Sequence, residues 1–535
     1  MPGPADIHPT VRDAAFDVLR EFGLTTIFSN PGSTEIDFLG SLPEDFRFVL
    51  GLHEASVVGM ATGFALGRGA PAFAVVHTTA GLGNAVSALA TARVNRAPLV
   101  VVVGQQDRRH IAYQPFLAGQ LAGLAGDYPV RVDEPSAAQA VPGALARAFH
   151  EAQTGRGPAL VIVPMDDWAA PAIAHDERPA PVRVLRAARA DPAAVEELAA
   201  LVAAASSPAL VSGADIADEA AWSALVALAE RLQCPVFHEP FSGGAGFPQD
   251  HPLFAGHLPA AREQLRARLR GHDLVLIVGG PAIRQYLFEP GELVDPGTRI
   301  AVVTANADEA HRSAAELVVL APVADVCTQL AAAVAQRPPA EPTAAWRPPA
   351  PAPAGALTAS HVLEGLARRL PADSVLFEES PSNRPELLDR VAIRAPMGLL
   401  SPAMGGLGFA IPAATGVRMA LPERPVVAVV GDGSAMYAIQ ALWSAATYGV
   451  GAVFVILSNG GYRVMDHLAR DQRVTAPWPA FGTLDVAMIA RGFGCEALRI
   501  ETIDELAASL DDVVGSLRTR ETPLLLEVVI EAGAT

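Results

Sequence analysis

Cysteine and positive charge are both scarce in this 535-residue chain. The three cysteines, Cys234, Cys327 and Cys495, match neither a disulfide framework nor the spacing of metal ligands. Lys and Arg number 39 against 57 Asp and Glu, the formal net charge is −18, and no basic run occurs. These absences argue against a nucleic-acid groove and favour a reducing, cytoplasmic location.

Long apolar runs are absent as well. No stretch approaches the ~18 apolar residues of a membrane helix without a glycine, a proline or a charge. The first ten residues, MPGPADIHPT, have neither the basic start nor the apolar centre of a secretory signal. We therefore expect neither membranes nor nucleic acids among the partners.

Short apolar runs alternate with helical patterns through a chain that is 51% hydrophobic. This alternation is typical of doubly wound α/β domains, and the length allows two to four of them. We predict three: residues 1–180, 185–337 and 355–535. Residues 168–181 and the Pro- and Ala-rich residues 336–354 are interpreted as linkers. The expected strands are 26–28, 48–50, 72–76, 99–103, 159–163, 209–212, 236–238, 274–278, 300–304, 375–377, 426–430, 453–457 and 524–529.

The most informative stretch runs from residue 426 to residue 468. An apolar run, VVAVV, ends at GDGS, and a second run, AVFVIL, ends at SNGGY. A right-handed crossover would bring both strand ends to one edge of a sheet. There the oxygens of Asp432, Asn459 and the Gly461 carbonyl suit Mg²⁺, which prefers oxygen ligands and a phosphate partner.

A helix is expected directly after Gly433, where its free N–H groups would face that phosphate. Ile439, Leu442, Trp443 and Ala446 would share one face of this helix. The simpler interpretation is an ordinary strand–helix–strand unit with a glycine-rich turn. The second motif, at this spacing from the first, favours the diphosphate–metal interpretation.

Three further side chains stand at strand ends or turns. Glu54 precedes an apolar helix, where it suits a proton donor or acceptor but also an ordinary helix-start carboxylate. His77 ends a buried strand before a glycine-rich turn, and Ser33 lies in the turn Asn-Pro-Gly-Ser. Each of them, taken alone, is better explained by a structural role.

Together these segments resemble the thiamin-diphosphate-dependent decarboxylase superfamily along the whole chain, and within it benzoylformate decarboxylase most closely. The resemblance rests on segments in one order and spacing: FSNPGSTEIDFLGSLPEDFRFVLGLHEASVVGMATGFALG, VHTTAGLGNAV, MGGLGFAIPAATGV and the GDG/SNGGY pair. It implies thiamin diphosphate and Mg²⁺ as cofactors.

The resemblance also implies roles for individual residues. Glu54 would bond the aminopyrimidine ring of the coenzyme and drive its activation. Ser33 would hold the substrate carboxylate, and His77 would shuttle protons. The metal would bind Asp432, Asn459 and Gly461. The remaining coenzyme contacts implied are Ser382, Gly405, Leu407, Gly433, Ser434 and Tyr462, and the implied substrate-pocket residues are Phe116, Leu117, Val464, Met465 and Leu468.

In such enzymes Glu54 of one subunit serves the coenzyme held by another subunit, which implies at least a homodimer and commonly a homotetramer. The implied reaction converts a 2-oxo acid to an aldehyde and CO₂.

Three positions depart from benzoylformate decarboxylase. Tyr286 stands where that family has a second active-site histidine, Pro381 replaces a hydroxyl near the diphosphate, and Leu468 replaces an aromatic ring. A phenol stays protonated at neutral pH and relays protons poorly. Two alternatives follow: a carboligase or 2-hydroxyketone lyase, including an acetolactate-synthase-like enzyme, and a coenzyme-binding protein without turnover. The presence of Glu54 and His77 disfavours the second.

Overall fold

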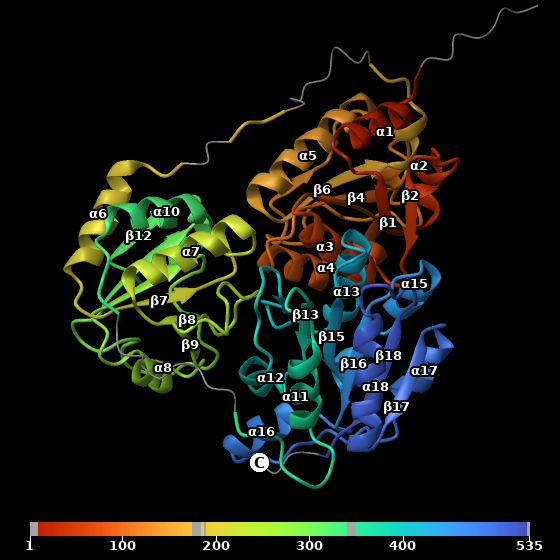
Figure 1. The fold of residues 1–535 in the computed structure, drawn as a ribbon. Helices are drawn as coiled ribbons and strands as arrows, with labels where there is room; N and C mark the ends of the chain where they lie inside the picture. The colour runs from red at the N-terminus through yellow and green to blue at the C-terminus, as the bar shows by residue number, and fades with distance from the viewer. Residues whose placement is uncertain (1–8, 174–182, 187–188, 340–348, 532–535) are drawn as a thin grey trace, which may run out of the picture. The chain divides into compact units, whose positions relative to one another are not determined.

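The computed structural model describes residues 9–173, 183–186, 189–339 and 349–531 (Figure 1). These residues form three six-stranded parallel sheets with helices between the strands. The predicted α/β fold class is therefore confirmed. Among the described residues, no helix combines the length and the apolar character needed to cross a membrane.

The first sheet has the order β2-β1-β3-β4-β6-β5. Its strands are β1 (Thr26–Asn30), β2 (Arg47–Leu50), β3 (Ala72–Val76), β4 (Leu99–Gln105), β5 (Arg131–Asp133) and β6 (Pro158–Pro164). Its helices are α1 (Val11–Glu21), α2 (Ile36–Leu39), α3 (Glu54–Arg68), α4 (Thr78–Val94) and α5 (Val141–Gly155).

The second sheet has the order β12-β11-β10-β7-β8-β9. Its strands are β7 (Pro208–Ser212), β8 (Val236–His238), β9 (Phe254–His257), β10 (Leu274–Val278), β11 (Arg299–Thr304) and β12 (Leu317–Leu320). Its helices are α6 (Pro192–Ala204), α7 (Glu219–Leu232), α8 (Arg262–Leu269), α9 (Ala307–Arg312) and α10 (Val323–Ala333).

The third sheet has the order β14-β13-β15-β16-β18-β17, and Figure 1 shows β15, β16, β18 and β17 side by side. Its strands are β13 (Val375–Glu379), β14 (Leu399–Leu400), β15 (Val426–Gly431), β16 (Val453–Ser458), β17 (Glu496–Ile500) and β18 (Leu524–Val529). Its helices are α11 (Ala359–Arg369), α12 (Arg384–Arg390), α13 (Ala410–Ala420), α14 (Asp432–Ala435), α15 (Ala441–Thr447), α16 (Arg463–Asp471), α17 (Val486–Gly492) and α18 (Ile503–Ser516).

The chain divides into two compact units. One comprises Met1–Leu185, Met404–Ile500 and Gly515–Val529, and the other comprises Arg186–Ala403, Glu501–Val514 and Ile530–Thr535. Glu54, His77, Asp432 and Asn459 belong to the first unit.

All thirteen predicted strands are present, but two other predictions are wrong. The linker does not begin at residue 168, because Trp168 is buried and its ring centroid lies 4.5 Å from that of Phe38. The rest of that segment, from residue 174, lies outside the described residues. The single helix after Gly433 is two short helices, α14 and α15. Between them the N–H groups of Tyr437 and Ala438 bond carbonyls three residues back, which tightens the turn.

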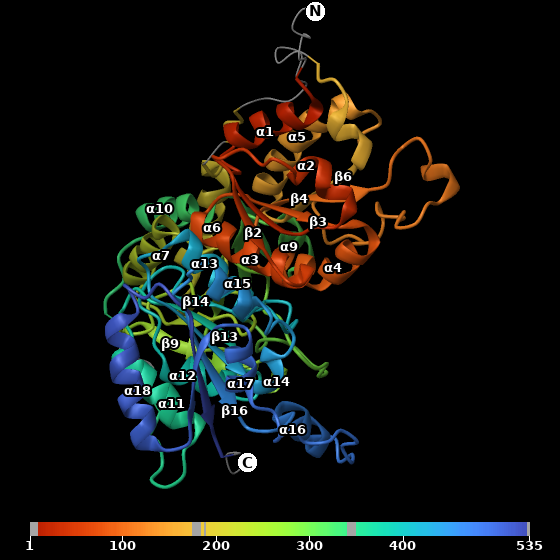
Figure 2. The same ribbon diagram turned by 90° about the vertical axis from the view of Figure 1, so that its right-hand side faces the viewer.

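Within the first unit, α3 packs closely against α13 through glycines (Figures 1 and 2). A Cβ on Gly63 would lie 1.9 Å from the carbonyl oxygen of Ala413, and one on Gly416 would lie 2.0 Å from that of Met60. The obstacles are main-chain atoms, so a side chain cannot be accommodated by a change of rotamer. These glycines therefore set the distance between α3, which carries Glu54, and α13.

We expect Gly63→Ala to destabilise the protein by about 1–3 kcal/mol, because the methyl group forces the two backbones apart. The measurement is urea unfolding followed by circular dichroism. Gly83→Ala is the matched control, since a Cβ on Gly83, in α4, meets no atom within 4 Å. Equal stability of the two variants would contradict the close packing of α3 and α13.

Candidate active site

Glu54 is the first residue of α3, and its side chain is almost buried, with the residue 7% exposed. Its Oε1 accepts a hydrogen bond from Asn30 Nδ2 at 3.1 Å, and its Oε2 accepts one from Asn84 Nδ2 at 3.0 Å. Asn30 ends β1 and Asn84 lies on α4, so three elements meet at this carboxylate. The two amides fix both of its oxygens, which holds the group ready to bond a ligand.

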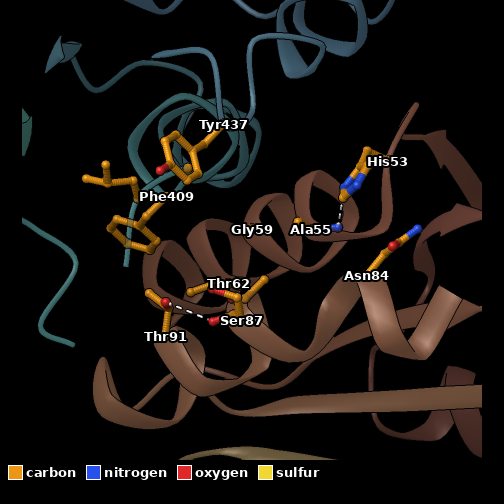
Figure 3. Close-up of a pocket in the computed structure, with 12 residues that line it drawn as sticks. His53, Ala55, Gly59, Thr62, Asn84, Ser87, Thr91, Phe409 and Tyr437 are labelled. Carbon is orange, nitrogen blue, oxygen red and sulfur yellow. Dashed lines mark hydrogen bonds between the residues drawn. The ribbon is translucent and has the colours of Figure 1, made fainter. Parts of the chain in front are cut away.

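A cavity of about 200 Å³ opens beside the start of α3 (Figure 3). It is lined by His53 and Ala55, the chain neighbours of Glu54, and by Asn84. On the other side it is lined by Leu407 and Tyr437. Of the predicted coenzyme contacts, Leu407 thus lines a cavity next to Glu54. Gly405, two residues earlier, has φ +80°, a conformation that favours glycine.

Asp432 follows β15 directly, and the residue is 3% exposed. Its Oδ1 accepts from the N–H of Gly433 at 2.8 Å, and its Oδ2 accepts from the N–H of Gly460 at 2.7 Å. Burial raises the pKa of Asp432 above its ordinary value, while the N–H groups of Gly460, Gly433 and Asn459 oppose that rise. A cation beside this carboxylate would favour its charged form in the same way.

Asn459 follows β16, which pairs with β15 in parallel so that Gly431 lies opposite Leu457. Both predicted metal ligands therefore stand at the same edge of the sheet, as predicted. Asn459 Oδ1 accepts from Gly461 N at 3.1 Å, and the Gly461 carbonyl accepts from Arg463 N at 3.0 Å.

The donor set at this edge fits Mg²⁺. Each of these oxygens keeps a second lone pair, and carboxylate, amide and carbonyl oxygens are ligands that Mg²⁺ takes. In the described part of the chain, no three His, Cys, Asp or Glu side chains gather as a metal cluster. A metal here would thus depend on Asp432 together with amide and main-chain oxygens.

The loop after Asn459 folds back over Gly433. Tyr462 packs edge-to-face on Phe481 at 4.9 Å, and a Cβ on Gly433 would lie 3.1 Å from the Phe481 ring. Ser434, another predicted coenzyme contact, is buried in α14. Glycine at position 433 therefore leaves room for a closed loop over the predicted diphosphate position.

His77 immediately precedes α4, and its Nδ1 lies 3.0 Å from Glu35 Oε2 and 3.0 Å from Thr34 Oγ1. Ser33 is exposed at the start of the same short turn. The structure thus brings two predicted residues, Ser33 and His77, to neighbouring positions around Glu35.

The predicted substrate-pocket residues lie on two exposed segments of the first unit. Phe116, 88% exposed, and the half-buried Leu117 belong to the segment after β4, drawn in orange and extending away from the sheet in Figure 2. Met465 is exposed on α16, and Val464 and Leu468 are half-buried there.

Tyr286 and Ser382 belong to the second unit. Tyr286 is 63% exposed in the loop after β10, and its ring centroid lies 6.5 Å from that of Phe241. The loop is fixed by Arg284, which donates to both carboxylate oxygens of Glu239 at 3.2 and 3.0 Å. Ser382 is half-buried in the turn after β13.

Three polar residues of this site were not predicted from the sequence. Asn30 and Asn84 flank glycine-rich turns, and asparagine is so common in turns that neither stood out. Glu35 sits in the helical turn after Ser33, where an exposed, dipole-favoured carboxylate is the usual outcome. No signal in the sequence separates the buried Glu35 from its exposed neighbour Asp37.

Three family descriptions match the chain in succession. They read "Thiamine pyrophosphate enzyme, N-terminal TPP binding domain" for residues 9–124, "central domain" for residues 195–330 and "C-terminal TPP binding domain" for residues 389–528. The benzoylformate decarboxylase of Pseudomonas aeruginosa is 42% identical over 526 residues, which span 97% of this chain and 98% of that protein.

Solved structures agree with these matches. A thiamine diphosphate-dependent 4-hydroxybenzoylformate decarboxylase from Rhodococcus jostii RHA1 has a TM-score of 0.92 at 33% identity, over 98% of this chain and 99% of that one. The benzoylformate decarboxylase of Polynucleobacter necessarius has a TM-score of 0.91 at 31% identity, over 98% of this chain and 99% of that one.

Proposed function

Because this chain belongs to the thiamine pyrophosphate enzyme family, with decarboxylases among its relatives, we propose that it decarboxylates an aryl 2-oxo acid of the benzoylformate type. The products are CO₂ and the corresponding aldehyde. The observation that carries the proposal is the 42% identity to a benzoylformate decarboxylase over nearly the whole of both chains. The buried Glu54 with its two amide donors supports it.

Thiamin diphosphate is the coenzyme of the family, and Mg²⁺ is the metal we propose at Asp432, Asn459 and the Gly461 carbonyl. When bound, the coenzyme supplies a nucleophilic carbon and an electron sink for the decarboxylation. The diphosphate would meet Gly433 and Ser434, and Leu407 with the Gly405 carbonyl would support the rings. Tyr462 would close the loop above them.

The protein's own groups bind, orient and move protons. Glu54 would exchange a proton with the aminopyrimidine ring of the coenzyme, and its two amide partners already hold the carboxylate in one orientation. Ser33 holds the substrate carboxylate, and His77 transfers protons at the reacting carbon. The two exposed segments carrying Phe116, Leu117, Val464, Met465 and Leu468 exclude water once covered.

We propose a homodimer as the minimal active unit and a homotetramer as the assembly, in the cytoplasm. The exposed apolar side chains Ile36, Leu52, Phe116 and Tyr437 in the first unit support burial against another subunit. The three cysteines are all free, which suits a reducing compartment. The boundaries 1–180, 185–337 and 355–535 remain our proposal for the three domains.

A substrate panel tests the proposed reaction. With coenzyme and Mg²⁺ present, CO₂ release from benzoylformate, 4-hydroxybenzoylformate, pyruvate and a branched 2-oxo acid is measured in parallel. We expect kcat/KM for the aryl acids to exceed that for pyruvate by at least about 100-fold, the scale of a well-filled apolar pocket. A preference for pyruvate would contradict the aryl assignment.

Tyr286 gives the carboligase alternative a specific test. Loss of CO₂ would leave the substrate carbon electron-rich. Protonation of that carbon would give the aldehyde, whereas bonding to a second aldehyde would give a 2-hydroxyketone. A phenol relays the proton less well than an imidazole, so carboligation should compete better here than in histidine-bearing relatives. We expect Tyr286→His to shift the product ratio toward free aldehyde, measured by chromatography at a fixed acceptor aldehyde.

Tyr286→Phe is the matched control, because it keeps the ring and removes the hydroxyl. If the histidine and phenylalanine variants both keep the wild-type ratio, Tyr286 takes no part in the proton transfer and does not favour carboligation.

A further inference from the structure

The carboxylate of Glu35 is enclosed at the centre of the turn that holds Ser33, with the residue only 1% exposed. Its Oε2 accepts from the N–H of Gly32 at 2.6 Å and lies 3.0 Å from His77 Nδ1. Its Oε1 accepts from the hydroxyl of Thr34. Because the carboxylate is buried and both of its oxygens have hydrogen-bond partners, it is held in a single orientation.

These contacts determine which nitrogen of His77 carries the proton. The Thr34 hydroxyl hydrogen points to Glu35 Oε1, and a bare Nδ1 facing Glu35 Oε2 would set two lone pairs against each other. A hydrogen on Nδ1 can instead be shared between Oε2 of Glu35 and Oγ1 of Thr34, both of which accept it. The neutral imidazole then keeps its lone pair on Nε2.

Two glycines make room for this arrangement. A Cβ on Gly32 would lie 2.4 Å from Nδ1 of His77, and a Cβ on Gly104, in β4, would lie 1.7 Å from Oε1 of Glu35. Neither glycine has a positive φ, so close approach, not backbone conformation, is what requires them. The turn, β4 and the end of β3 thus fit around one carboxylate–imidazole pair.

We propose that Glu35 is a positioning residue for His77: it fixes the ring orientation, holds the hydrogen on Nδ1 and stabilises the imidazolium whenever Nε2 accepts a proton. This role rests on the proposed function, in which His77 transfers protons at the substrate. Glu35 acts through His77 and makes no contact with substrate or coenzyme. The arrangement is a carboxylate–imidazole pair like those that orient catalytic histidines in other enzymes.

The first test compares Glu35→Gln with Asp37→Asn, an equally conservative change of an exposed carboxylate two residues away. We expect Glu35→Gln to lower kcat by roughly 10- to 100-fold, part of the ~10²–10⁴-fold that a positioned acid–base group contributes, with KM changed less than threefold. Asp37→Asn should leave kcat and KM unchanged.

A double-mutant cycle with His77→Ala distinguishes the positioning role of Glu35 from a purely structural one. If Glu35 acts through His77, Glu35→Gln has no further effect on kcat once the imidazole is absent. Glu35→Asp, which keeps the charge on a shorter side chain, should lower kcat less than Glu35→Gln does. Additive losses in the cycle would overturn the proposal.

A second measurement does not depend on turnover. Crystal structures of the wild type and of Glu35→Gln should show a single His77 ring orientation in the former and a rotated or split ring in the latter. Gly104→Ala, which displaces the carboxylate without altering its chemistry, should have the same effect. If the wild type releases no CO₂ but the ring moves as expected, the proposed function fails and the positioning role stands. An unmoved ring in both variants overturns the positioning role.

Discussion

Asp432→Ala is expected to weaken coenzyme binding at least about 100-fold and to abolish turnover, and saturating thiamin diphosphate should not restore activity. The carboxylate is the only charged group among the three proposed metal ligands, so its loss would remove the one negative charge that they offer to Mg²⁺. A 100-fold loss corresponds to about 2.7 kcal/mol.

Binding is measured by titration calorimetry with thiamin diphosphate at fixed Mg²⁺. Asp471→Ala, at an exposed carboxylate at the end of α16, is the matched control. The Asp432 carboxylate also accepts hydrogen bonds from the N–H groups of Gly433 and Gly460, so the thermal midpoint of each variant is needed to show that the fold survives. Unchanged coenzyme affinity in a folded Asp432→Ala protein would refute the metal assignment.

Glu54→Gln is expected to keep the fold and the coenzyme while losing about 10²–10⁴-fold in kcat, the range for a positioned acid–base group. A glutamine amide cannot exchange the proton that activates the coenzyme. The NH₂ group introduced at position 54 would face the NH₂ group of Asn30 or Asn84. A flip of that asparagine's side-chain amide would present its oxygen instead. Folding should therefore be preserved.

The direct measurement is deuterium exchange at C2 of the bound coenzyme, followed by NMR after acid quench. We expect exchange to slow by a similar factor in Glu54→Gln and to remain at the wild-type rate in Glu44→Gln, a surface control. Exchange at the wild-type rate in the Glu54 variant would remove Glu54 from its proposed role.

The prediction of strands from the sequence failed in one systematic way. The five strands that were missed are β5, β9, β12, β14 and β17, and all of them are edge strands. A central parallel strand such as β4 is buried on both faces and reads as a continuous apolar run. An edge strand such as β17 is exposed at alternating and even adjacent positions, so the run is broken.

The site was predictable where chain connectivity dictates it. Asp432 and Asn459 follow adjacent parallel strands. A right-handed crossover between two such strands places both strand ends at the same edge of the sheet. The break between α14 and α15 and the enclosure of Glu35 depend on tertiary neighbours such as Gly104, which lies 69 positions from Glu35 in the chain. Local patterns carry no information about such neighbours.

The most direct test of the proposed function is the product stoichiometry with benzoylformate at saturating thiamin diphosphate and Mg²⁺. We predict one CO₂ and one benzaldehyde for each benzoylformate consumed when no acceptor aldehyde is added, and no conversion when the coenzyme is omitted. Formation of a 2-hydroxyketone from aldehydes alone, with benzoylformate left unconsumed, would contradict the assignment as a decarboxylase.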